Sequence, residues 1–288
     1  MKLSLKVKAL NIVRNIFRIP GIESFLASQT RGKSPNQLVS KLVPNPYQYP
    51  IPSFRELKRD GLTLRVDISD YIGHYLYFGF TDEGMTALFA LCRERFTVLD
   101  IGANIGWTVL NLARLAGHGK VIGFEPDLYN FERCSENLRL NNFKNAEVFN
   151  VGLGAHAGRV NMQVRTPSNR GGNRIAPQGS GASHLVDIVR LDDFPPARDL
   201  TRIDLVKLDV EGYELHVMKG AEALLRKHRP MLFIELDDNN LRDQGDSAED
   251  LIHFLLDIGY RRIAHAEKKS PVMASDDFRG CHFDLIAT

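Results

Sequence analysis

The chain has 288 residues, of which 43% are hydrophobic, so it can bury one large α/β domain of roughly 200 residues and carry an attached segment. Its formal net charge of +2 is close to neutral, which argues against a nucleic-acid partner. The cysteines Cys92, Cys134 and Cys281 are far apart and lack disulfide or metal-ligand spacing, so we expect no metal and a reducing, cytoplasmic compartment. Charged residues interrupt every apolar stretch, and we expect no membrane-spanning helix.

The first 20 residues have the pattern of a basic amphipathic helix. Lys2, Lys6, Lys8, Arg14 and Arg18 occur there without an acid, and large apolar residues recur at helical spacing. Charges lie where a signal peptide would need its apolar core, so we expect no secretion signal. We favour a helix that packs on its own domain or on a partner; the alternative is a helix lying on the anionic inner face of a membrane.

Proline-rich composition separates this helix from the rest of the chain. Four prolines between Pro44 and Pro52 predict a linker or an arm without regular structure. Beyond it, residues 62–68 alternate like a strand, and a helix is expected from Asp82 to about Arg95. We therefore predict a basic helix and arm in residues 1–52, a strand-helix extension in residues 53–96, and a large α/β domain in residues 97–288.

From Thr97 on, short apolar runs alternate with helical stretches. This alternation predicts a mostly parallel sheet with helices on both of its faces. Strands are expected at residues 97–101, 120–125, 146–151, 205–209, 231–235, 260–265 and 282–287, with a further strand pair at 159–165 and 185–190. Helices are expected at residues 106–116, 127–142 and 247–258 and from Tyr213 onward.

The first of these strands ends in a glycine-bearing turn, Asp100-Ile-Gly-Ala-Asn-Ile-Gly106, that leads into a helix. Gly102 and Gly106 let the backbone turn tightly and come close to a ligand, and the free N–H groups of the helix point into the same space. Glu125 ends the next strand, where a carboxylate can accept both hydroxyls of a ribose. The pattern predicts a pocket for a cofactor that contains adenosine.

The spacing favours S-adenosylmethionine over a dinucleotide. A dinucleotide fingerprint requires G-x-G-x-x-G, but Asn104 replaces its second glycine and Trp107 takes its last place. No Gly-Lys-Ser/Thr follows, which argues against a P-loop. Asn104 tolerates left-handed backbone angles, and we expect it to hydrogen-bond the methionine part of the donor.

Three motifs, spread from about Glu83 to the C-terminus, resemble the FkbM family of S-adenosylmethionine-dependent methyltransferases. They are the glycine turn, then Gly123-Phe-Glu-Pro126, and then Asp204-Leu-Val-Lys-Leu-Asp-Val-Glu-Gly-Tyr-Glu214 with Lys219-Gly-Ala221. The resemblance implies a Rossmann-like class I methyltransferase fold with an antiparallel last strand, and S-adenosyl-L-methionine as cofactor. It implies O-methylation of a hydroxyl on a sugar, a glycan or a secondary metabolite. The expected cofactor-binding residues are Asp100, Gly102, Asn104, Gly106, Glu125, Pro126 and Asp209.

Acidic residues gather at the carboxyl ends of the predicted strands, where open α/β sheets bind ligands. Some of them could instead cap helix N-termini. Methyl transfer is an in-line displacement, so the site mainly positions the acceptor, but an alcohol must also lose its proton. The candidates for this catalytic role are Asp209, Glu211, Glu235 and His184. A divalent metal held by these carboxylates is a weaker hypothesis, because no ligand spacing requires one.

The loop in residues 166–184 is rich in Gly, Ser and Asn and interrupts the strand pattern. A loop of this length inside a compact domain is often a lid or a binding loop. We expect Asn169, Arg170, Asn173 and Arg174 to offer donors to a polyhydroxylated or anionic acceptor. The alternative is a surface excursion without contacts.

Two other functional classes share parts of this pattern. An NAD(P)-dependent oxidoreductase would also have the strand-turn-helix and the acidic ribose partner. A non-catalytic module that binds S-adenosylmethionine would keep the fold without turnover. The acceptor cannot be derived from the sequence, because loops of unpredictable shape determine it. The sequence also leaves the oligomeric state open.

Overall fold

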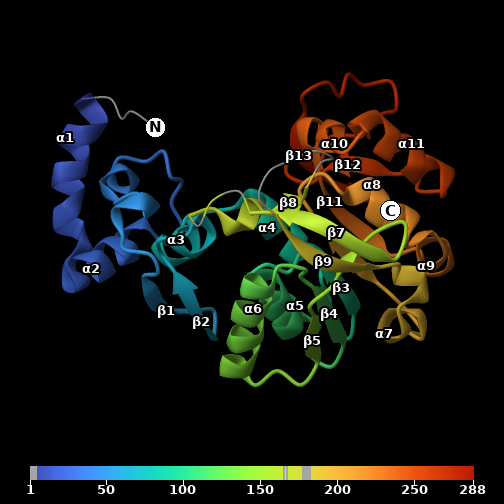
Figure 1. Ribbon diagram of the computed structural model, residues 1–288, viewed down its shortest axis with the longest axis horizontal. Helices are drawn as coiled ribbons and strands as arrows, with labels where there is room; N and C mark the ends of the chain where they lie inside the picture. The colour runs from blue at the N-terminus through green and yellow to red at the C-terminus, as the bar shows by residue number, and fades with distance from the viewer. Residues whose placement is uncertain (1–4, 165, 167, 177–182) are drawn as a thin grey trace. The chain divides into compact units, whose positions relative to one another are not determined.

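The computed structural model describes residues 5–164, 166, 168–176 and 183–288 (Figure 1). The chain divides into two compact units, of which the first is Met1–Asp82 with Arg165–Gly171. The second unit is Glu83–Val164 with Gly172–Thr288. The boundaries expected from composition, after residues 52 and 96, stay predictions. In the described part of the chain, every helix is too short or too polar to reach across a membrane.

The second unit is built on a seven-stranded sheet of order β12-β13-β11-β10-β3-β4-β5. Its strands are β3 (Thr97–Ile101), β4 (Lys120–Phe124), β5 (Ala146–Phe149), β10 (Leu205–Leu208), β11 (Met231–Asp237), β12 (Ile263–His265) and β13 (His282–Ala287). The pairs among β3, β4, β5, β10 and β11 are parallel, whereas β13 runs antiparallel to both β11 and β12. The predicted Rossmann-like sheet with its antiparallel last strand is therefore confirmed.

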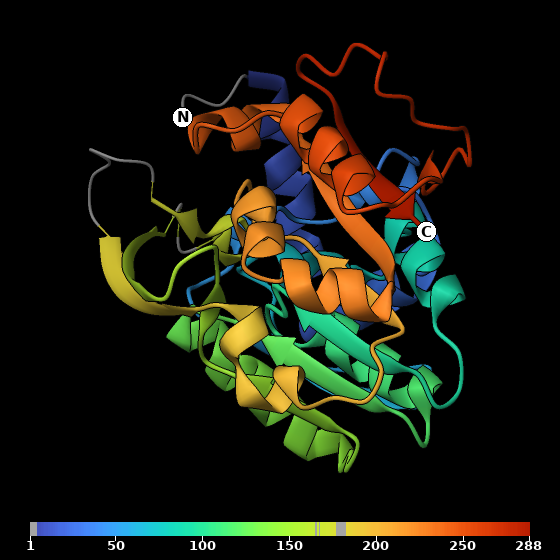
Figure 2. The same ribbon diagram turned by 90° about the vertical axis from the view of Figure 1, so that its right-hand side faces the viewer.

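Helices cover both faces of this sheet (Figures 1 and 2). They are α4 (Glu83–Leu91), α5 (Trp107–Ala116), α6 (Leu128–Asn141), α8 (Glu214–Lys219), α9 (Glu222–His228), α10 (Asp238–Asp243) and α11 (Ala248–Asp257). Alternate residues of β3 point to opposite faces: Val98 joins a core with α4 and α5, and Leu99 a second core with α8, α9 and α11. All five residues of β3 are buried, as expected for a strand covered on both sides.

Two predicted helices differ from their expected extents. The helix expected to reach Arg95 ends at Leu91, and Arg95 has a left-handed φ of 66°. The helix predicted from Tyr213 breaks into α8 and α9 around Gly220. A Cβ at Gly220 would lie 2.0 Å from the carbonyl oxygen of Gly154, so the chain there approaches a neighbouring backbone too closely for a side chain.

The predicted strand pair of residues 159–165 and 185–190 is present as an antiparallel pair, β7 (Gly158–Gln163) and β9 (Ser183–Val189). These strands lie in a separate four-stranded sheet of order β6-β9-β7-β8. The remaining elements of this region are β6 (Gly152–Leu153), β8 (Arg174–Ile175), α7 (Pro195–Arg198) and the 3-10 turns η4 (Arg170–Gly172) and η5 (Leu191–Asp193).

The first unit combines short helices with a two-stranded antiparallel sheet. Its elements are α1 (Leu5–Arg14), η1 (Asn15–Arg18), α2 (Pro20–Thr30), η2 (Val39–Leu42), η3 (Pro46–Gln48), β1 (Phe54–Arg59), β2 (Leu62–Asp67) and α3 (Tyr71–Phe78). Leu26, Val43 and Phe78 form its buried core. The prediction of no regular structure between Pro44 and Pro52 is wrong for η3, because a proline at the first position suits a helical turn.

Candidate active site

The candidate site lies at the carboxyl ends of β3 and β10, where the strand order of the sheet reverses. From β3 the chain proceeds outward to β4 and β5, whereas β10 and β11 lie on the other side of β3. In open α/β sheets a crevice forms at this switch point, because the loops that follow the two strands diverge. The motifs predicted to bind the cofactor follow β3, β4 and β10.

The turn after β3 depends on residues that accept left-handed backbone angles. Gly102 has φ +85° and Gly106 has φ +91°. Asn104 has φ 48°, as predicted for it. A Cβ at Gly102 would lie 1.9 Å from the carbonyl oxygen of Asp209, so the turn after β3 is packed directly on the backbone that follows β10. Gly102 thus brings two of the predicted motifs into contact.

Glu125, just after β4, is hydrogen-bonded to the backbone of this turn. Its Oε2 accepts a hydrogen bond from the backbone N–H of Asn104 at 2.8 Å, and its Oε1 accepts one from that of Asp127 at 2.9 Å. Burial raises the pKa of Glu125 to about 7, although these two hydrogen bonds oppose the shift. Each carboxylate oxygen keeps a second lone pair for a ligand hydroxyl. The ribose-binding role of Glu125 stays a prediction.

Pro126 continues from Glu125 and is held by a residue that the sequence did not single out. Asn150, just after β5, donates its Nδ2 hydrogens to the carbonyl oxygens of Glu125 at 2.9 Å and Pro126 at 3.0 Å. Asn150 therefore ties the end of β5 to the segment that carries the predicted ribose partner.

Lys207 is a buried cation at the centre of the site. Its Nζ donates a 2.7 Å hydrogen bond to the carbonyl oxygen of Gly102 and lies 3.5 Å from Oδ1 of Asp100 and 3.2 Å from Oδ2 of Asp209. Burial by itself would lower the pKa of Lys207, but the carboxylates of Asp209 and Asp100 override this effect and raise it. The ammonium group is therefore charged and holds both carboxylates and the glycine turn.

Asp100 is fully buried and also accepts a hydrogen bond from the hydroxyl of Thr108. Burial raises the pKa of Asp100, against the opposing charge of Lys207. Because no part of Asp100 reaches solvent in this structure, it stabilises the turn from beneath. A direct contact with the cofactor stays a prediction.

The segment after β10 forms a tight turn around Glu214. Oε1 of Glu214 accepts hydrogen bonds of 3.1 Å from the backbone N–H groups of Val210 and Gly212. Burial raises the pKa of Glu214 to about 7, with the backbone hydrogen bonds acting against it. Gly212 has φ +100°, and Glu211 has φ 56° and accepts a 3.1 Å hydrogen bond from Nδ2 of Asn240. This turn fixes Asp209 and Glu211 at the sheet edge.

Glu235 lies on β11 among other acids. Burial raises its pKa to about 10, and the charges of Asp209, Glu211, Glu214 and Asp284 add to the shift. Its Oε1 lies 3.6 Å from Nε2 of His282, whose Nδ1 is 2.7 Å from Oδ2 of Asp237. Because the folded protein keeps a proton on Glu235 at neutral pH, this side chain is a hydrogen-bond donor there.

The structure places His184 apart from these acids. His184 lies in β9 rather than in the loop before it, and its Nε2 is 3.6 Å from Oδ2 of Asp127, the residue that caps α6. Asn173 donates to the same Asp127 oxygen at 3.2 Å. His184 and Asn173 thus meet at the start of α6, next to the segment of Glu125, and a catalytic role for His184 stays a prediction.

The predicted substrate loop is divided between the two compact units. Within the first unit, the backbone N–H of Arg170 donates to Oδ2 of Asp70 at 2.8 Å, and Asn169 pairs with Thr166. Within the second unit, Arg174 donates to Oδ2 of Asp243 at 2.7 Å. Residues 167 and 177–182 of the loop, and residue 165 just before it, lie outside the described residues. Binding of an acceptor by these side chains stays a prediction.

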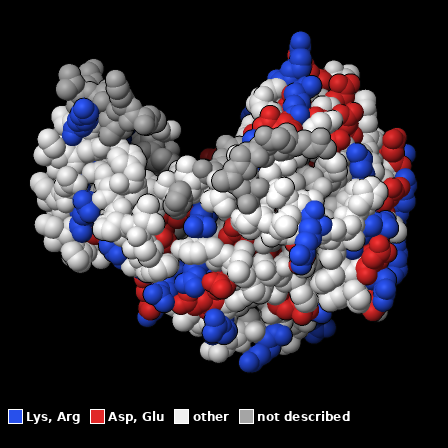
Figure 3. Space-filling model, in the orientation of Figure 1, with Lys and Arg blue, Asp and Glu red and all other residues white. Residues whose placement is uncertain are grey.

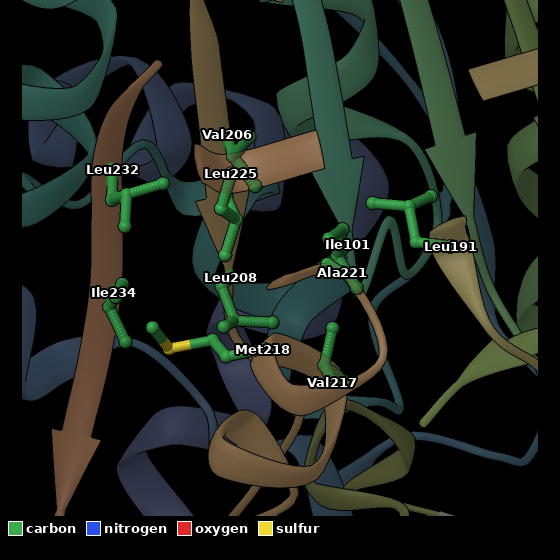
Figure 4. Close-up of a pocket in the computed structure, with 10 residues that line it drawn as sticks. All are labelled: Ile101, Leu191, Val206, Leu208, Val217, Met218, Ala221, Leu225, Leu232 and Ile234. Atoms are coloured by element: carbon green, nitrogen blue, oxygen red, sulfur yellow. The ribbon is translucent and has the colours of Figure 1, made fainter. Parts of the chain in front are cut away.

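A small apolar cavity lies beneath the site, between the sheet and the helices α8 and α9 (Figure 4). Its volume is about 10 Å³, and it is lined by Ile101, Leu191, Val206, Leu208, Val217, Met218, Ala221, Leu225, Leu232 and Ile234. A nucleoside needs a pocket of a few hundred Å³. This cavity is therefore a packing void in the core and not a binding site.

Besides Asn150, Lys207 and His282 were not predicted from the sequence, for different reasons. Lys207 lies in the buried strand β10. A lysine in such an apolar run indicates a buried ion pair, since a buried lysine needs a partner. A role for His282 was less apparent from the sequence, because its pairing with Asp237 depends on the antiparallel register of β11 and β13. In the described part of the chain, no three His, Cys, Asp or Glu side chains are grouped to hold a metal ion.

The chain matches the family described as Methyltransferase FkbM domain over residues 100–262, more than half of its 288 residues. It is 30% identical over 156 residues to the protein "Methyltransferase sdnD" of Sordaria araneosa, an alignment that covers 43% of this chain and 60% of that protein. It is 30% identical over 162 residues to "2-O-methyltransferase NoeI" of Sinorhizobium fredii, covering 50% of this chain and 64% of that protein.

Among solved structures, the chain is similar to that of Methyltransferase FkbM from Methylobacillus flagellatus KT, with 20% sequence identity and a TM-score of 0.43. The similarity covers 76% of this chain and 55% of that chain. The chain spans about three fifths of the length of the two curated relatives, since the alignments cover 60% and 64% of them.

Proposed function

The chain belongs to the FkbM family of methyltransferases, and on this premise we propose that it transfers a methyl group from S-adenosylmethionine to a hydroxyl oxygen of a sugar, a glycan or a secondary metabolite. The observation that carries this proposal is the contact between two motifs at the switch point of the sheet. Gly102 of the glycine turn lies against the backbone of Asp209, and Lys207 joins both. A cofactor on the turn would therefore present its reactive end to the carboxylates after β10.

The residues of the turn fit S-adenosylmethionine. The sulfonium of this cofactor, when bound, supplies an electrophilic methyl group. The left-handed backbone angles of Gly102 and Gly106 shape the turn, and Glu125 offers two acceptor lone pairs to the ribose hydroxyls. Asn104, whose N–H donates to Glu125, and Pro126, which follows Glu125 in the chain, would flank the bound ribose. Asn104 and Trp107 stand where a dinucleotide fingerprint has its second and third glycines, which favours a cofactor without a pyrophosphate over NAD.

On the acceptor side, Asp209 is our candidate for the base. Its side chain is 37% exposed, whereas that of Glu235 is 21% exposed. Asp209 is held in place by Lys207, so that it can accept a hydrogen bond from the acceptor hydroxyl and take its proton as the new bond forms. Glu235 carries a proton at neutral pH and would donate a hydrogen bond to the acceptor instead of removing its proton. We propose that Glu211 and His184 position the acceptor.

A sugar hydroxyl is the acceptor that we favour. The printed name of the relative NoeI describes a 2-O-methyltransferase, which supports oxygen as the methylated atom. Asn173, which contacts Asp127 two residues after Glu125, and Arg174 carry polar donors that would suit a polyhydroxylated or anionic molecule. We also propose the cytoplasm as the site of reaction, because Cys92, Cys134 and Cys281 are all free thiols.

The test is to incubate the purified chain with donor labelled in its methyl group and with a panel of neutral sugars, uronates, glycans and small hydroxylated metabolites. Mass spectrometry should reveal a product heavier by one methylene on oxygen. The variant Asp209→Asn should lose this product while its affinity for S-adenosylhomocysteine stays within about tenfold of the wild type. Transfer at an unchanged rate by Asp209→Asn would refute the assigned base. Hydride exchange with NAD in place of methyl transfer would refute the function.

A further inference from the structure

Large apolar side chains are exposed on the helices of the first unit. Ile12 is 72% exposed, Ile16 and Ile19 are each 54% exposed, and Phe25 on α2 is 64% exposed. Ile12 lies on α1, Ile16 lies on η1, and Ile19 is the extended residue between η1 and α2, so exposed apolar side chains recur along this whole segment. Side chains of this size are rarely grouped on a surface unless that surface meets a partner or a lipid bilayer.

Other side chains of these helices already pack on their own unit. Asn11 donates to the hydroxyl of Tyr47 at 3.0 Å, and Gln48 donates to the carbonyl oxygen of Asn11 at 3.2 Å and to Asn15 at 3.1 Å. Leu26 is buried against Val43 and Phe78. The fold of the unit therefore accounts for these packed side chains, and it leaves the exposure of Ile12, Ile16, Ile19 and Phe25 unexplained.

The charge of this segment is strongly one-sided. Residues 1–55 contain nine Lys and Arg residues and a single acid, Glu23. Glu23 is 1% exposed and accepts a 2.6 Å hydrogen bond from Nε of Arg55, so its charge is neutralised inside the unit. Lys8 and Lys41, by contrast, are exposed. In Figure 3 the surface of residues 1–82, at the left, is mostly white with separate blue patches.

We infer that the outer face of α1, η1 and α2, defined by Ile12, Ile16, Ile19 and Phe25, docks on an anionic lipid bilayer. Helices that lie in a membrane interface insert their apolar side chains at the headgroup level and place lysines and arginines beside anionic headgroups. The apolar side chains would gain nothing from the phosphates of a nucleic acid, and the absence of an exposed acid in residues 1–55 disfavours a basic partner.

The test is co-sedimentation of the full chain, without cofactor, with vesicles of phosphatidylcholine alone or with phosphatidylglycerol added. The wild type should bind the anionic vesicles at least about tenfold more tightly than the neutral ones, and high salt should weaken this binding. The double variant Ile16→Glu, Ile19→Glu should bind the anionic vesicles at least about tenfold more weakly. Both substituted side chains are exposed, so the fold should tolerate the change.

The matched control is Leu128→Glu, which adds a charge at a side chain that is 55% exposed on α6 of the second unit, and it should bind like the wild type. Wild-type protein that ignores both kinds of vesicle, or a double variant that binds as well as the control, would overturn the inference. A dimer that the double variant dissociates, without binding of vesicles, would also overturn it and make this face a subunit interface. Because no donor is present, these outcomes are independent of methyl transfer.

Discussion

Lys207 and Asp100 face each other across the neighbouring strands β10 and β3, with Nζ 3.5 Å from Oδ1 and both side chains almost fully buried. The same ammonium group holds Asp209 and the carbonyl oxygen of Gly102. A buried cation in this position neutralises two carboxylates that would otherwise repel each other. Lys207 also connects two segments of the site: the glycine turn, where we expect the cofactor, and the end of β10, where we expect the acceptor.

Replacing this cation should destabilise the fold. We expect Lys207→Met to lower the free energy of unfolding by about 3–5 kcal/mol, because Asp100 would stay buried without its partner. Urea denaturation measures this change. The double variant Lys207→Met, Asp100→Asn should recover a large part of the loss. The control Lys120→Met removes a surface ion pair with Glu147 and should cost less than about 1 kcal/mol. Equal stability of Lys207→Met and the wild type would contradict the assigned role of Lys207.

The contact between the two motifs should not tolerate a side chain at Gly102. We expect Gly102→Ala to lower the unfolding free energy by about 2 kcal/mol or more, because its φ is +85° and its Cβ would overlap the carbonyl oxygen of Asp209. Thermal unfolding measures the loss, and calorimetry should detect weaker binding of S-adenosylhomocysteine. Gly158→Ala is the control, since a Cβ added there would meet no atom within 4 Å. Matching losses in both variants would argue against this packing constraint.

The raised pKa of Glu235 should make stability depend on pH. The unfolded chain releases this proton near pH 4.5, whereas the folded protein keeps it to about pH 10. Between these values the folded state carries the extra proton, so its stability falls as the pH rises, by up to about 1.4 kcal/mol per pH unit. Glu235→Gln should remove this pH dependence. The unfolding free energy of the variant minus that of the wild type should therefore be larger at about pH 8 than at about pH 5.

The measurement is the unfolding free energy of both proteins across this pH range. Glu56→Gln is the control, because its side chain is 61% exposed in the first unit and should leave the pH dependence unchanged. If the unfolding free energies of Glu235→Gln and the wild type changed in parallel with pH, Glu235 would ionise normally. Glu235 would then again be a candidate for the catalytic base.

Glu125 should determine the affinity for the donor. Glu125→Gln keeps the size of the side chain, but an amide has only one acceptor oxygen for the N–H groups of Asn104 and Asp127, and fewer lone pairs for a ribose. We expect it to bind S-adenosylhomocysteine at least about tenfold more weakly, which corresponds to about 1.4 kcal/mol. Calorimetric titration gives this value. Glu132→Gln, on the exposed side of α6, should bind like the wild type, and an equal loss there would exclude a specific effect.

The sequence predicted the central sheet because its strands are short apolar runs separated by helices, a pattern that local periodicity captures. The left-handed angles of the glycine turn followed from the residue types at Gly102, Asn104 and Gly106. The partners of Lys207 could not be predicted in this way, since Asp100 lies more than 100 residues earlier and meets it only through strand register. The pairing of Asp237 with His282 has the same origin.

The loop in residues 166–184 shows a second limit of sequence reasoning. Its composition predicted a single binding loop, but Arg170 is bonded to Asp70 in the first unit and Arg174 to Asp243 in the second. Composition does not determine on which unit a loop packs, because the contact of Arg170 uses a backbone N–H that any residue carries and the contact of Arg174 depends on a partner 69 residues away.

The central claim is that the turn beside Gly102 and Glu125 receives S-adenosylmethionine. Calorimetric titration of the wild-type chain with S-adenosylhomocysteine and, separately, with NAD tests it most directly. We expect a single site with micromolar affinity for S-adenosylhomocysteine, about 8 kcal/mol of binding free energy, and no measurable heat with NAD. Binding of NAD without binding of S-adenosylhomocysteine would contradict the account.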